Sequence, residues 1–269
     1  MSPSWRDEIG VHLAPTRLCL VRLRRGLRPA LVAELEQSVE AKASGHWSSA
    51  LDALEQLLSA SEWRGAALRV VLSDCWVRYA VVPWSPDLKS PQERFGHACQ
   101  LLASLYGDAV SGWDVRLSEA PPQHARVACT APVNLLADVR SLCERHSVKL
   151  LSLQPQLIAA YHNWRHRLPG SGAWFVTVGA GTLAAACLGE HAWERVYTVR
   201  IGTDWPRELK RLQTFGRLAG ERGGEVFIDA PLAWREVAGP AGRDLHWLED
   251  DSSAASTLQR LERVRRLAA

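Results

Sequence analysis

Two pairs of side chains in this sequence have a spacing that could support chemistry on a helix. His162 and His166 stand four residues apart in a segment, 155–167, whose apolar pattern predicts a helix, and this spacing can hold a metal ion. No Cys, Asp or Glu stands nearby in sequence as a third ligand, so a solvated basic helix end is favoured. Cys143 and His146 could form a thiol nucleophile, although an ordinary amphipathic helix explains them as well.

A glycine-rich turn is the third feature that could do chemistry. Backbone N–H groups in the run Gly179-Ala180-Gly181-Thr182 could form an anion-binding nest. The same run is typical of a tight hairpin between two strands, and this interpretation is favoured because no charged partners accompany the glycines. The sequence contains neither a P-loop nor a Gly-x-Ser-x-Gly motif.

The elements that would position these residues fall into two successive groups. Each group opens with a meander of three strands and continues with helices and further strands, which suggests an internal duplication. The run at 168–172, Leu-Pro-Gly-Ser-Gly, separates them. Strands are expected at 8–13, 18–23, 29–39, 68–72, 77–82, 113–118, 125–130, 148–153, 174–178, 183–188, 193–200 and 225–229. Helices are expected at 47–60, 90–106, from 132, and at 155–167 and 205–219.

This order predicts a mixed α/β protein with two lobes rather than a simple alternating βαβ sheet. The first lobe is expected to cover residues 1–168 and to carry a small inserted α/β subdomain around 85–145. The second lobe is expected at 172–231, and residues 240–269 are expected to be a polar C-terminal tail, in which 253–267 could form a helix.

Composition excludes several classes of protein. The 269 residues are 47% apolar and 23% charged, as in a packed globular protein, and the scattered charges sum to only +3, which argues against nucleic-acid binding. No apolar run reaches the ~18 residues of a membrane span, and the first eight residues lack the core of a secretory signal. Six widely spaced cysteines favour reduced, buried thiols. We therefore expect a cytoplasmic protein without direct membrane insertion.

Two turns at the heads of the two meanders carry a resemblance to a known superfamily. The first is Ile9-Gly10-Val11-His12-Leu13-Ala14-Pro15-Thr16, and the second is Phe175-Val176-Thr177-Val178-Gly179-Ala180-Gly181-Thr182. They resemble the paired turns of the actin, heat-shock chaperone and sugar-kinase superfamily. Within it, the chain is most similar to the PilM-type proteins of type IV pilus machines and their relatives in type II secretion. The resemblance spans residues 7–231 and implies a two-lobed actin-like, ribonuclease-H-like fold with a reduced second lobe.

The resemblance also implies a site for ATP and Mg²⁺, and the first turn departs from it. In the family an Asp in each turn organises Mg²⁺ against the nucleotide phosphates, but these positions are His12 and Thr177 here. Mg²⁺ requires oxygen ligands, usually carboxylates and phosphates. The family's first-turn glycine is Ala14, and Pro15 after it has no N–H to offer a phosphate.

The second turn keeps more of the family pattern, since Gly179, Gly181 and Thr182 are present. The family's glycine pair after the last core strand, however, is replaced by the run at 229–231, Asp-Ala-Pro. We therefore expect the nucleotide turns to be vestigial, with no bound cofactor, no metal and no enzymatic activity.

The segment at 77–84, Val-Arg-Tyr-Ala-Val-Val-Pro-Trp, is rich in side chains suited to recognition. It resembles the strand before the peptide-binding subdomain of PilM-like proteins. Arg78, Tyr79 and Trp84 are candidate partner-binding residues because Arg and aromatic residues dominate interface hot spots. A half-buried strand explains them equally well.

The resemblance implies a non-catalytic cytoplasmic scaffold of a type IV pilus or related secretion machine. Its expected partner is the cytoplasmic N-terminal segment of a single-pass inner-membrane protein, which would hold the chain at the membrane periphery. One alternative is an ATP-binding actin-like ATPase or small-molecule kinase of the same superfamily. Another is the cytoplasmic part of a type II secretion L-type protein, although that protein is anchored and this chain shows no anchor.

Overall fold

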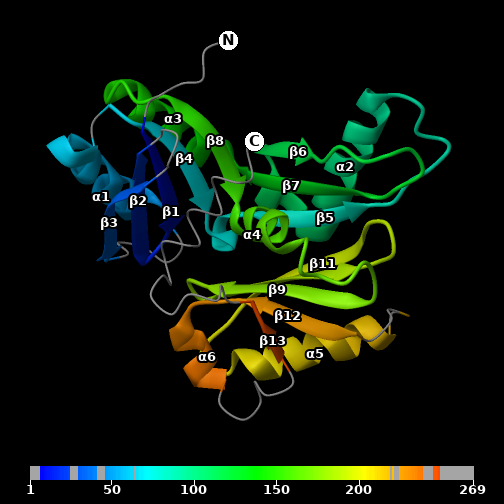
Figure 1. The fold of residues 1–269 in the computed structure, drawn as a ribbon. Coiled ribbons are helices and arrows are strands. Elements are labelled where there is room, and N and C mark those ends of the chain that lie inside the picture. The colour runs from blue at the N-terminus through cyan, green and yellow to red at the C-terminus, as the bar shows by residue number, and fades with distance from the viewer. Residues whose placement is uncertain are drawn as a thin grey trace. The chain divides into compact units, whose positions relative to one another are not determined.

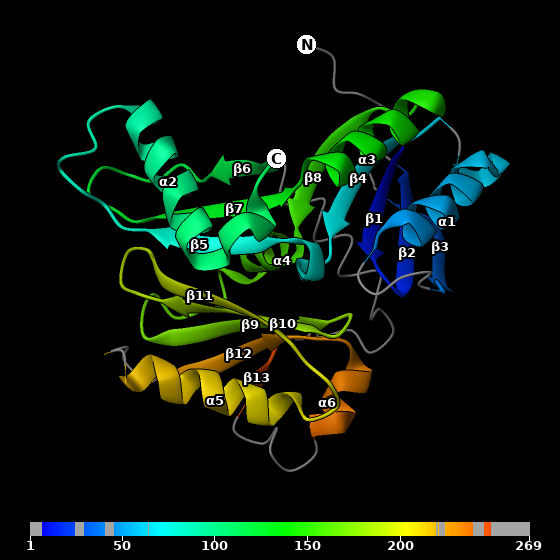
Figure 2. The ribbon, with the colours of Figure 1, turned by 180° about the vertical axis from the view of Figure 1, so that it is seen from behind.

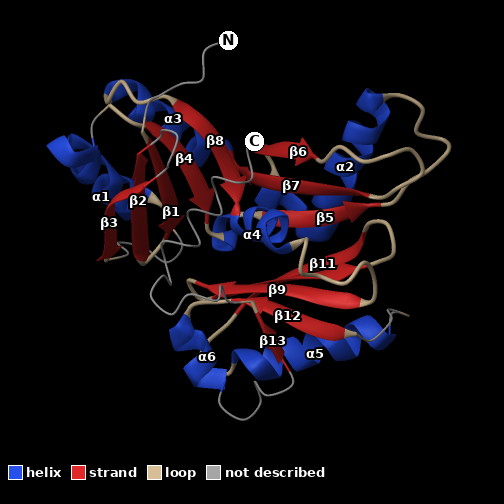
Figure 3. Cartoon of the chain, in the orientation of Figure 1, coloured by secondary structure: helices blue, strands red, loops and turns tan. Residues whose placement is uncertain are grey.

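The computed structural model describes residues 7–24, 30–40, 46–63, 65–218, 220, 224–238 and 245–248. The chain divides into two compact units, which Figures 1 and 2 show from opposite sides. Unit 1 contains the described residues of 1–75 and 134–163, and unit 2 contains those of 76–133 and 164–249. Figure 3 shows that each unit combines sheets with helices, so the predicted mixed α/β class is confirmed.

Unit 1 is built on a five-stranded sheet in the order β3-β2-β1-β4-β8. Its strands are β1 (Glu8–Ala14), β2 (Arg17–Arg24), β3 (Ala30–Ser38), β4 (Ala67–Leu72) and β8 (Leu150–Pro155). The first three form an antiparallel meander, whereas β4 pairs in parallel with β1 and β8 pairs in parallel with β4. Because β1 and β4 lie at the centre, their apolar residues are buried on both faces.

Helices α1 (Ser48–Ser59) and α3 (Val133–Arg145) lie on one face of this sheet in Figures 1 and 2. Helix α1 forms because Ala50, Leu54 and Leu58 recur on one side and are buried. Helix α4 (Gln156–Trp164) follows β8 directly. The backbone N–H of Leu157 donates to Asp74 Oδ1 at 3.1 Å. A side chain distant in sequence therefore accepts from one of the N–H groups that the first turn of a helix leaves without a partner inside the helix.

Unit 2 contains a second five-stranded sheet in the order β11-β10-β9-β12-β13. Its strands are β9 (Ala173–Gly179), β10 (Thr182–Leu188), β11 (Trp193–Arg200), β12 (Glu225–Asp229) and β13 (Leu245–Trp247). The order and directions repeat those of unit 1: a meander, then two parallel strands beside its first member. Helices α5 (Trp205–Leu218) and α6 (Leu232–Ala238) pack on one face through Trp205, Leu209 and Ala238.

Unit 2 also contains the elements inserted between β4 and α3. Strands β5 (Arg78–Val82), β7 (Arg126–Pro132) and β6 (Trp113–Leu117) form an antiparallel sheet in the order β5-β7-β6. Helix α2 (Pro91–Tyr106) covers it through Ala98 and Leu102. A capping box begins this helix, with Ser90 Oγ accepting from the Glu93 N–H at 3.1 Å. Short 3₁₀ turns complete the described chain: η1 (Ser61–Trp63), η2 (Asp74–Trp76) and η3 (Gly107–Val110).

The sequence pattern missed two elements, α6 and β13. Strand β13 lies inside the stretch expected to be a polar tail, yet it is the fifth strand of the second sheet, so that sheet extends past residue 231. The compact units are also a different division from the predicted lobes, since the inserted elements group with the second sheet. The helix expected at 253–267 lies outside the described residues. Among the residues described, no helix has the length and apolar character needed to cross a membrane.

Candidate functional site

The first hairpin turn joins β1 to β2 through two residues, Pro15 and Thr16, between the register pair Ala14 and Arg17. Ala14 is 1% exposed and Pro15 is buried, so this turn is packed into unit 1. The Thr16 carbonyl accepts a hydrogen bond from the Val39 N–H at 2.9 Å, which fixes the end of the meander. Because Pro15 carries no N–H, the turn lacks one of the donors that a phosphate cradle would use.

His12 lies on β1, two residues before this turn, and is partly buried. Its Nε2 is 3.2 Å from Oε1 of Gln156, the first residue of α4. This hydrogen bond joins β1 to the start of α4. An imidazole also supplies nitrogen at a position where a carboxylate would supply the oxygen ligands that Mg²⁺ prefers.

The second turn also has two residues, Ala180 and Gly181, between the register pair Gly179 and Thr182. Both residues have positive φ, 49° and 71°, which is the type I′ geometry of tight hairpins. The Gly181 carbonyl accepts from the Ile201 N–H at 2.8 Å. The hairpin interpretation of this glycine run therefore accounts for its conformation.

The position equivalent to His12 in the second sheet is Thr177 on β9, and it is 1% exposed. Its register partner on the parallel strand β12 is Asp229, which places the two residues side by side on that sheet. Thr182, on the other arm of the hairpin, is 5% exposed. Within the described parts of the chain, no three His, Cys, Asp or Glu side chains are grouped in a way that could hold a metal ion.

The three partner-binding candidates occupy different environments. Tyr79 is 1% exposed and belongs to the core, so its side chain could reach a partner only if unit 2 rearranged. Arg78 is partly exposed and its guanidinium carbon lies 5.8 Å from the centre of the Trp113 ring. Trp84, two residues after β5, is 48% exposed. Arg78 and Trp84 thus keep the exposure that a contact residue needs, whereas Tyr79 does not.

A groove of about 1110 Å³ lies in unit 2, and we call it the β5–β11 groove. Strand β5 and helix α2 form one wall, and β11 with the β10–β11 hairpin forms the other. The residues that line it include Tyr79, Leu101, Leu105, Tyr106, Glu194 and Thr198. Sequence analysis missed this groove because its walls come from residues more than 80 positions apart.

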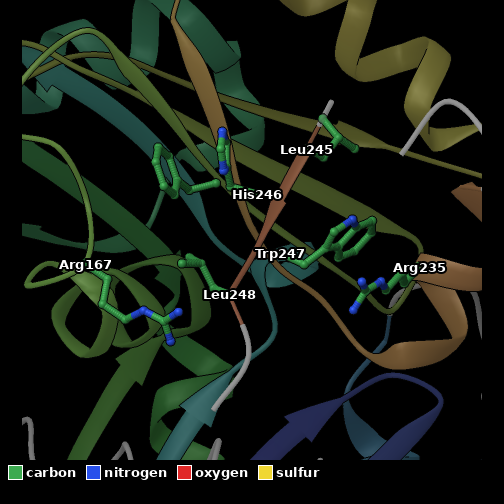
Figure 4. Close-up of a pocket in the computed structure, with 7 residues that line it drawn as sticks. Arg167, Arg235, Leu245, His246, Trp247 and Leu248 are labelled. Atoms are coloured by element: carbon green, nitrogen blue, oxygen red, sulfur yellow. The ribbon is translucent and has the colours of Figure 1, made fainter. Parts of the chain in front are cut away.

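A smaller pocket of about 360 Å³ surrounds β13 and is shown in Figure 4. The ring of His246 stacks on Phe227 with centroids 4.8 Å apart, and its Nε2 lies 3.6 Å from a Glu225 carboxylate oxygen. The Arg235 guanidinium carbon lies 5.5 Å from the centre of the Trp247 ring. These contacts explain why a three-residue strand can hold its place at the edge of the sheet.

The structure does not favour metal binding or thiol chemistry at the two pairs singled out from the sequence. Helix α4 ends at Trp164, so His162 and His166 do not share one helix face. Burial raises the pKa of the Cys143 thiol to about 11, which keeps it protonated at neutral pH. His146 instead lies 3.4 Å from a Glu55 carboxylate oxygen.

Comparison with known proteins gives matches in structure alone. No protein-family model and no curated protein matches the sequence. A chain of a PilM–PilN type IV pilus biogenesis complex aligns with 98% of this chain and 99% of its own length, at 15% identity and a TM-score of 0.67. A Bacteroides thetaiotaomicron protein with an actin-like ATPase fold and unknown function aligns with 93% of this chain and 94% of its own, at 11% identity and a TM-score of 0.61.

This chain has the actin-like fold. The predicted fold class is therefore confirmed, although identities this low establish the fold and nothing finer. A third similar structure is the cytoplasmic domain of EpsL, an inner-membrane component of the type II secretion system of Vibrio cholerae. It aligns with 97% of this chain and 94% of its own length, at 11% identity and a TM-score of 0.59.

Proposed function

We propose that this chain is a non-catalytic, cytoplasmic scaffold of a type IV pilus or related secretion machine. In this role it is a pseudo-ATPase, and the cytoplasmic segment of a single-pass inner-membrane protein recruits it to the membrane. The observation that carries the non-catalytic part is the first hairpin, where a carboxylate position of the family is His12. The assignment to such a machine is supported by nearly full-length similarity to a chain of the PilM–PilN complex and to the EpsL cytoplasmic domain.

The chemistry of the first hairpin opposes Mg²⁺-nucleotide binding in two ways. The imidazole of His12 has no oxygen ligand to offer Mg²⁺, and its Nε2 lies 3.2 Å from the side-chain oxygen of Gln156. Pro15 removes a backbone donor from the turn that would face phosphate. In the second sheet, Thr177 supplies a buried hydroxyl where the family has its other carboxylate. A neutral hydroxyl does not balance the charge of a divalent ion.

Nucleotide binding is tested by titration calorimetry with ATP and Mg²⁺. We expect a dissociation constant weaker than about 1 mM, roughly −4 kcal/mol, and no hydrolysis. The double variant His12→Asp, Thr177→Asp is the control, and we expect it to stay weak because the adenine-side glycine pair is also absent. Micromolar binding by the wild type that depends on Mg²⁺ would instead support the alternative, an actin-like ATPase or kinase.

Recruitment is tested by fractionating cells that express the chain alone or together with a single-span inner-membrane protein encoded beside it. We expect the chain to move to the membrane fraction only when that protein is present. Trp84→Ala should weaken the complex by about 2 kcal/mol, roughly thirtyfold, if Trp84 is a hot spot. Phe95→Ala is a matched control, because Phe95 is 46% exposed, close to the 48% of Trp84.

Two results would count against these assignments. A wild-type chain that stays soluble with every co-expressed neighbour would contradict the scaffold role. A Trp84→Ala variant that is recruited like Phe95→Ala would remove Trp84 from the binding site while leaving the role itself intact.

A further inference from the structure

Helix α5 presents a regular outer face to solvent. The residues that it buries on the sheet of unit 2 recur at intervals of four, three and four positions: Trp205, Leu209, Leu212 and Gly216. The same intervals, shifted by two residues, give a set that is exposed throughout: Arg207, Arg211, Thr214 and Leu218. Two residues turn an α-helix by about 200°, so the second set points away from the sheet along which α5 lies in Figures 1 and 2.

Two large apolar side chains of this helix are exposed near its C-terminal end. Leu218 is 80% exposed, the highest value among the large apolar residues that the described chain exposes, and Phe215 is 52% exposed. The Arg211 guanidinium carbon lies 5.6 Å from the centre of the Phe215 ring, so a cation and an apolar ring share one stretch of surface. A partner for this face must therefore accept apolar side chains and positive charge side by side.

The charge of the α5 face is positive, since four basic residues accompany two acidic ones over 204–218. Both acidic residues belong to ion pairs at the start of the helix: Asp204 with Arg207 at 3.8 Å, and Glu208 with Arg211 at 3.3 Å between the charged atoms. Lys210 and Arg217 are exposed, and neither forms an ion pair with another residue of the described chain. An anionic surface would therefore meet two positive charges that no neighbouring carboxylate balances.

A layer of anionic lipid suits this face better than a folded protein does. Headgroup phosphates complement the basic side chains, and the layer just below them accepts apolar ones such as Phe215 and Leu218. The long stems of Lys and Arg let their charges stay at headgroup level while the apolar side chains go deeper. A protein interface favours pockets and contains few lysines, yet the two pockets described above contain no residue of α5.

We propose that the outer face of α5 binds an anionic lipid surface, with Lys210 and Arg217 at the headgroups and Phe215 and Leu218 in the interfacial layer. The helix stays packed on its sheet through Leu209 and lies on the bilayer without crossing it. Two unbalanced charges and two apolar side chains give a weak contact, which does not carry the chain to a membrane by itself. The inference goes beyond the proposed function and does not require the protein partner proposed there.

Co-sedimentation with vesicles tests the contact, using the intact chain and no other protein. The vesicles contain about equal parts of phosphatidylglycerol and phosphatidylcholine, and the ionic strength is about 10 mM, where charges act over about 30 Å. We expect half-maximal binding near about 1 mM accessible lipid. Vesicles of phosphatidylcholine alone should bind at least about tenfold more weakly, and so should the anionic vesicles at about 100 mM salt.

The charged part of the contact is tested by Lys210→Gln with Arg217→Gln. This double variant should weaken binding to the anionic vesicles about thirtyfold, because two basic side chains leave the headgroup layer. Arg140→Gln with Lys149→Gln is the matched control, since it removes the same two residue types from exposed positions of unit 1. We expect the control to change binding less than about threefold.

The apolar part is tested by Phe215→Ala with Leu218→Ala, which should weaken binding about tenfold. Its matched control is Phe95→Ala with Leu105→Ala on α2, where the same residue types are 46% and 58% exposed. We expect that control to change binding less than about twofold. Circular dichroism shows whether each variant keeps its fold.

Several results would overturn the proposal. These are no binding up to about 10 mM lipid, equal binding to both kinds of vesicle, or α5 variants that behave like their matched controls. Binding to polyglutamate through Lys210 and Arg217 without binding to anionic vesicles would also overturn it and would indicate an acidic protein as the partner. Failure of the chain to follow its proposed partner to the membrane in cells would bear on the proposed function alone, because the vesicle assay contains no partner.

Discussion

The two five-stranded sheets of this chain have one topology but differ in the turn that heads each meander. Both hairpins have two-residue turns, and in both the carbonyl of the second turn residue accepts an N–H from the end of the third strand: Thr16 from Val39, and Gly181 from Ile201. Only the second turn uses positive φ. The two sheets therefore share turn length and this one hydrogen bond, while the sign of φ in the turn differs between them.

The sheets also differ where β1 meets β4 and β9 meets β12. In the first sheet Glu8 and Arg69 form a buried ion pair, with side chains 6% and 8% exposed and atoms 3.2 Å apart. The register of the hairpins places Ala173 and Phe227 at the equivalent positions of the second sheet. The same architecture thus accepts a charged pair in one copy and an apolar pair in the other.

The largest effect is expected from separating the charged pair. Arg69→Met should destabilise the chain by about 3–5 kcal/mol, because it removes the positive charge that faces the buried Glu8 carboxylate. The double variant Glu8→Ala, Arg69→Phe copies the second sheet and should recover most of that loss. Urea unfolding monitored by circular dichroism measures both. Equal losses in the single and double variants would show that the two sheets do not tolerate the same residues.

Helix contacts with each sheet should show the next largest effect. Leu54 on α1 and Leu209 on α5 are 0% and 2% exposed, so truncating either to Ala should cost about 2–5 kcal/mol. Leu101→Ala should cost clearly less, since Leu101 is partly buried and lines the β5–β11 groove. The same unfolding assay ranks the three variants. A Leu101→Ala loss equal to that of Leu209→Ala would show that the groove wall is part of a tight core.

How far the sequence predicts this molecule depends on the range of the interactions involved. Hairpins and amphipathic helices depend on neighbours within a few residues, so the tight hairpin at the glycine run was predicted correctly. Strand β13 has three residues and no alternation long enough to detect, and it holds its place through contacts with β12.

The candidate site was less predictable for the same physical reason. Local sequence does not separate Tyr79, which is buried, from Arg78, which is half-exposed, because burial depends on elements that are distant in sequence. The hydrogen bond between the His12 ring and the Gln156 side chain joins residues 144 apart and has no signal in the sequence. Local patterns indicated which residues the turns contain, but not which atoms those residues contact.

The smallest effects should come from the turns themselves, and they should have opposite signs. Ala180 has φ of 49°, a left-handed conformation that costs a residue with a Cβ about 1–2 kcal/mol. Glycine adopts this conformation freely but loses about 0.5–1 kcal/mol of chain entropy on folding, so Ala180→Gly should be neutral or stabilise the chain by up to about 1 kcal/mol.

In the first turn, Pro15 and Thr16 have no positive φ, and the proline already restricts the unfolded chain there. Pro15→Gly should therefore destabilise by about 1 kcal/mol. Differential scanning calorimetry of the two variants measures the contrast, which disappears if both turns can adopt either geometry.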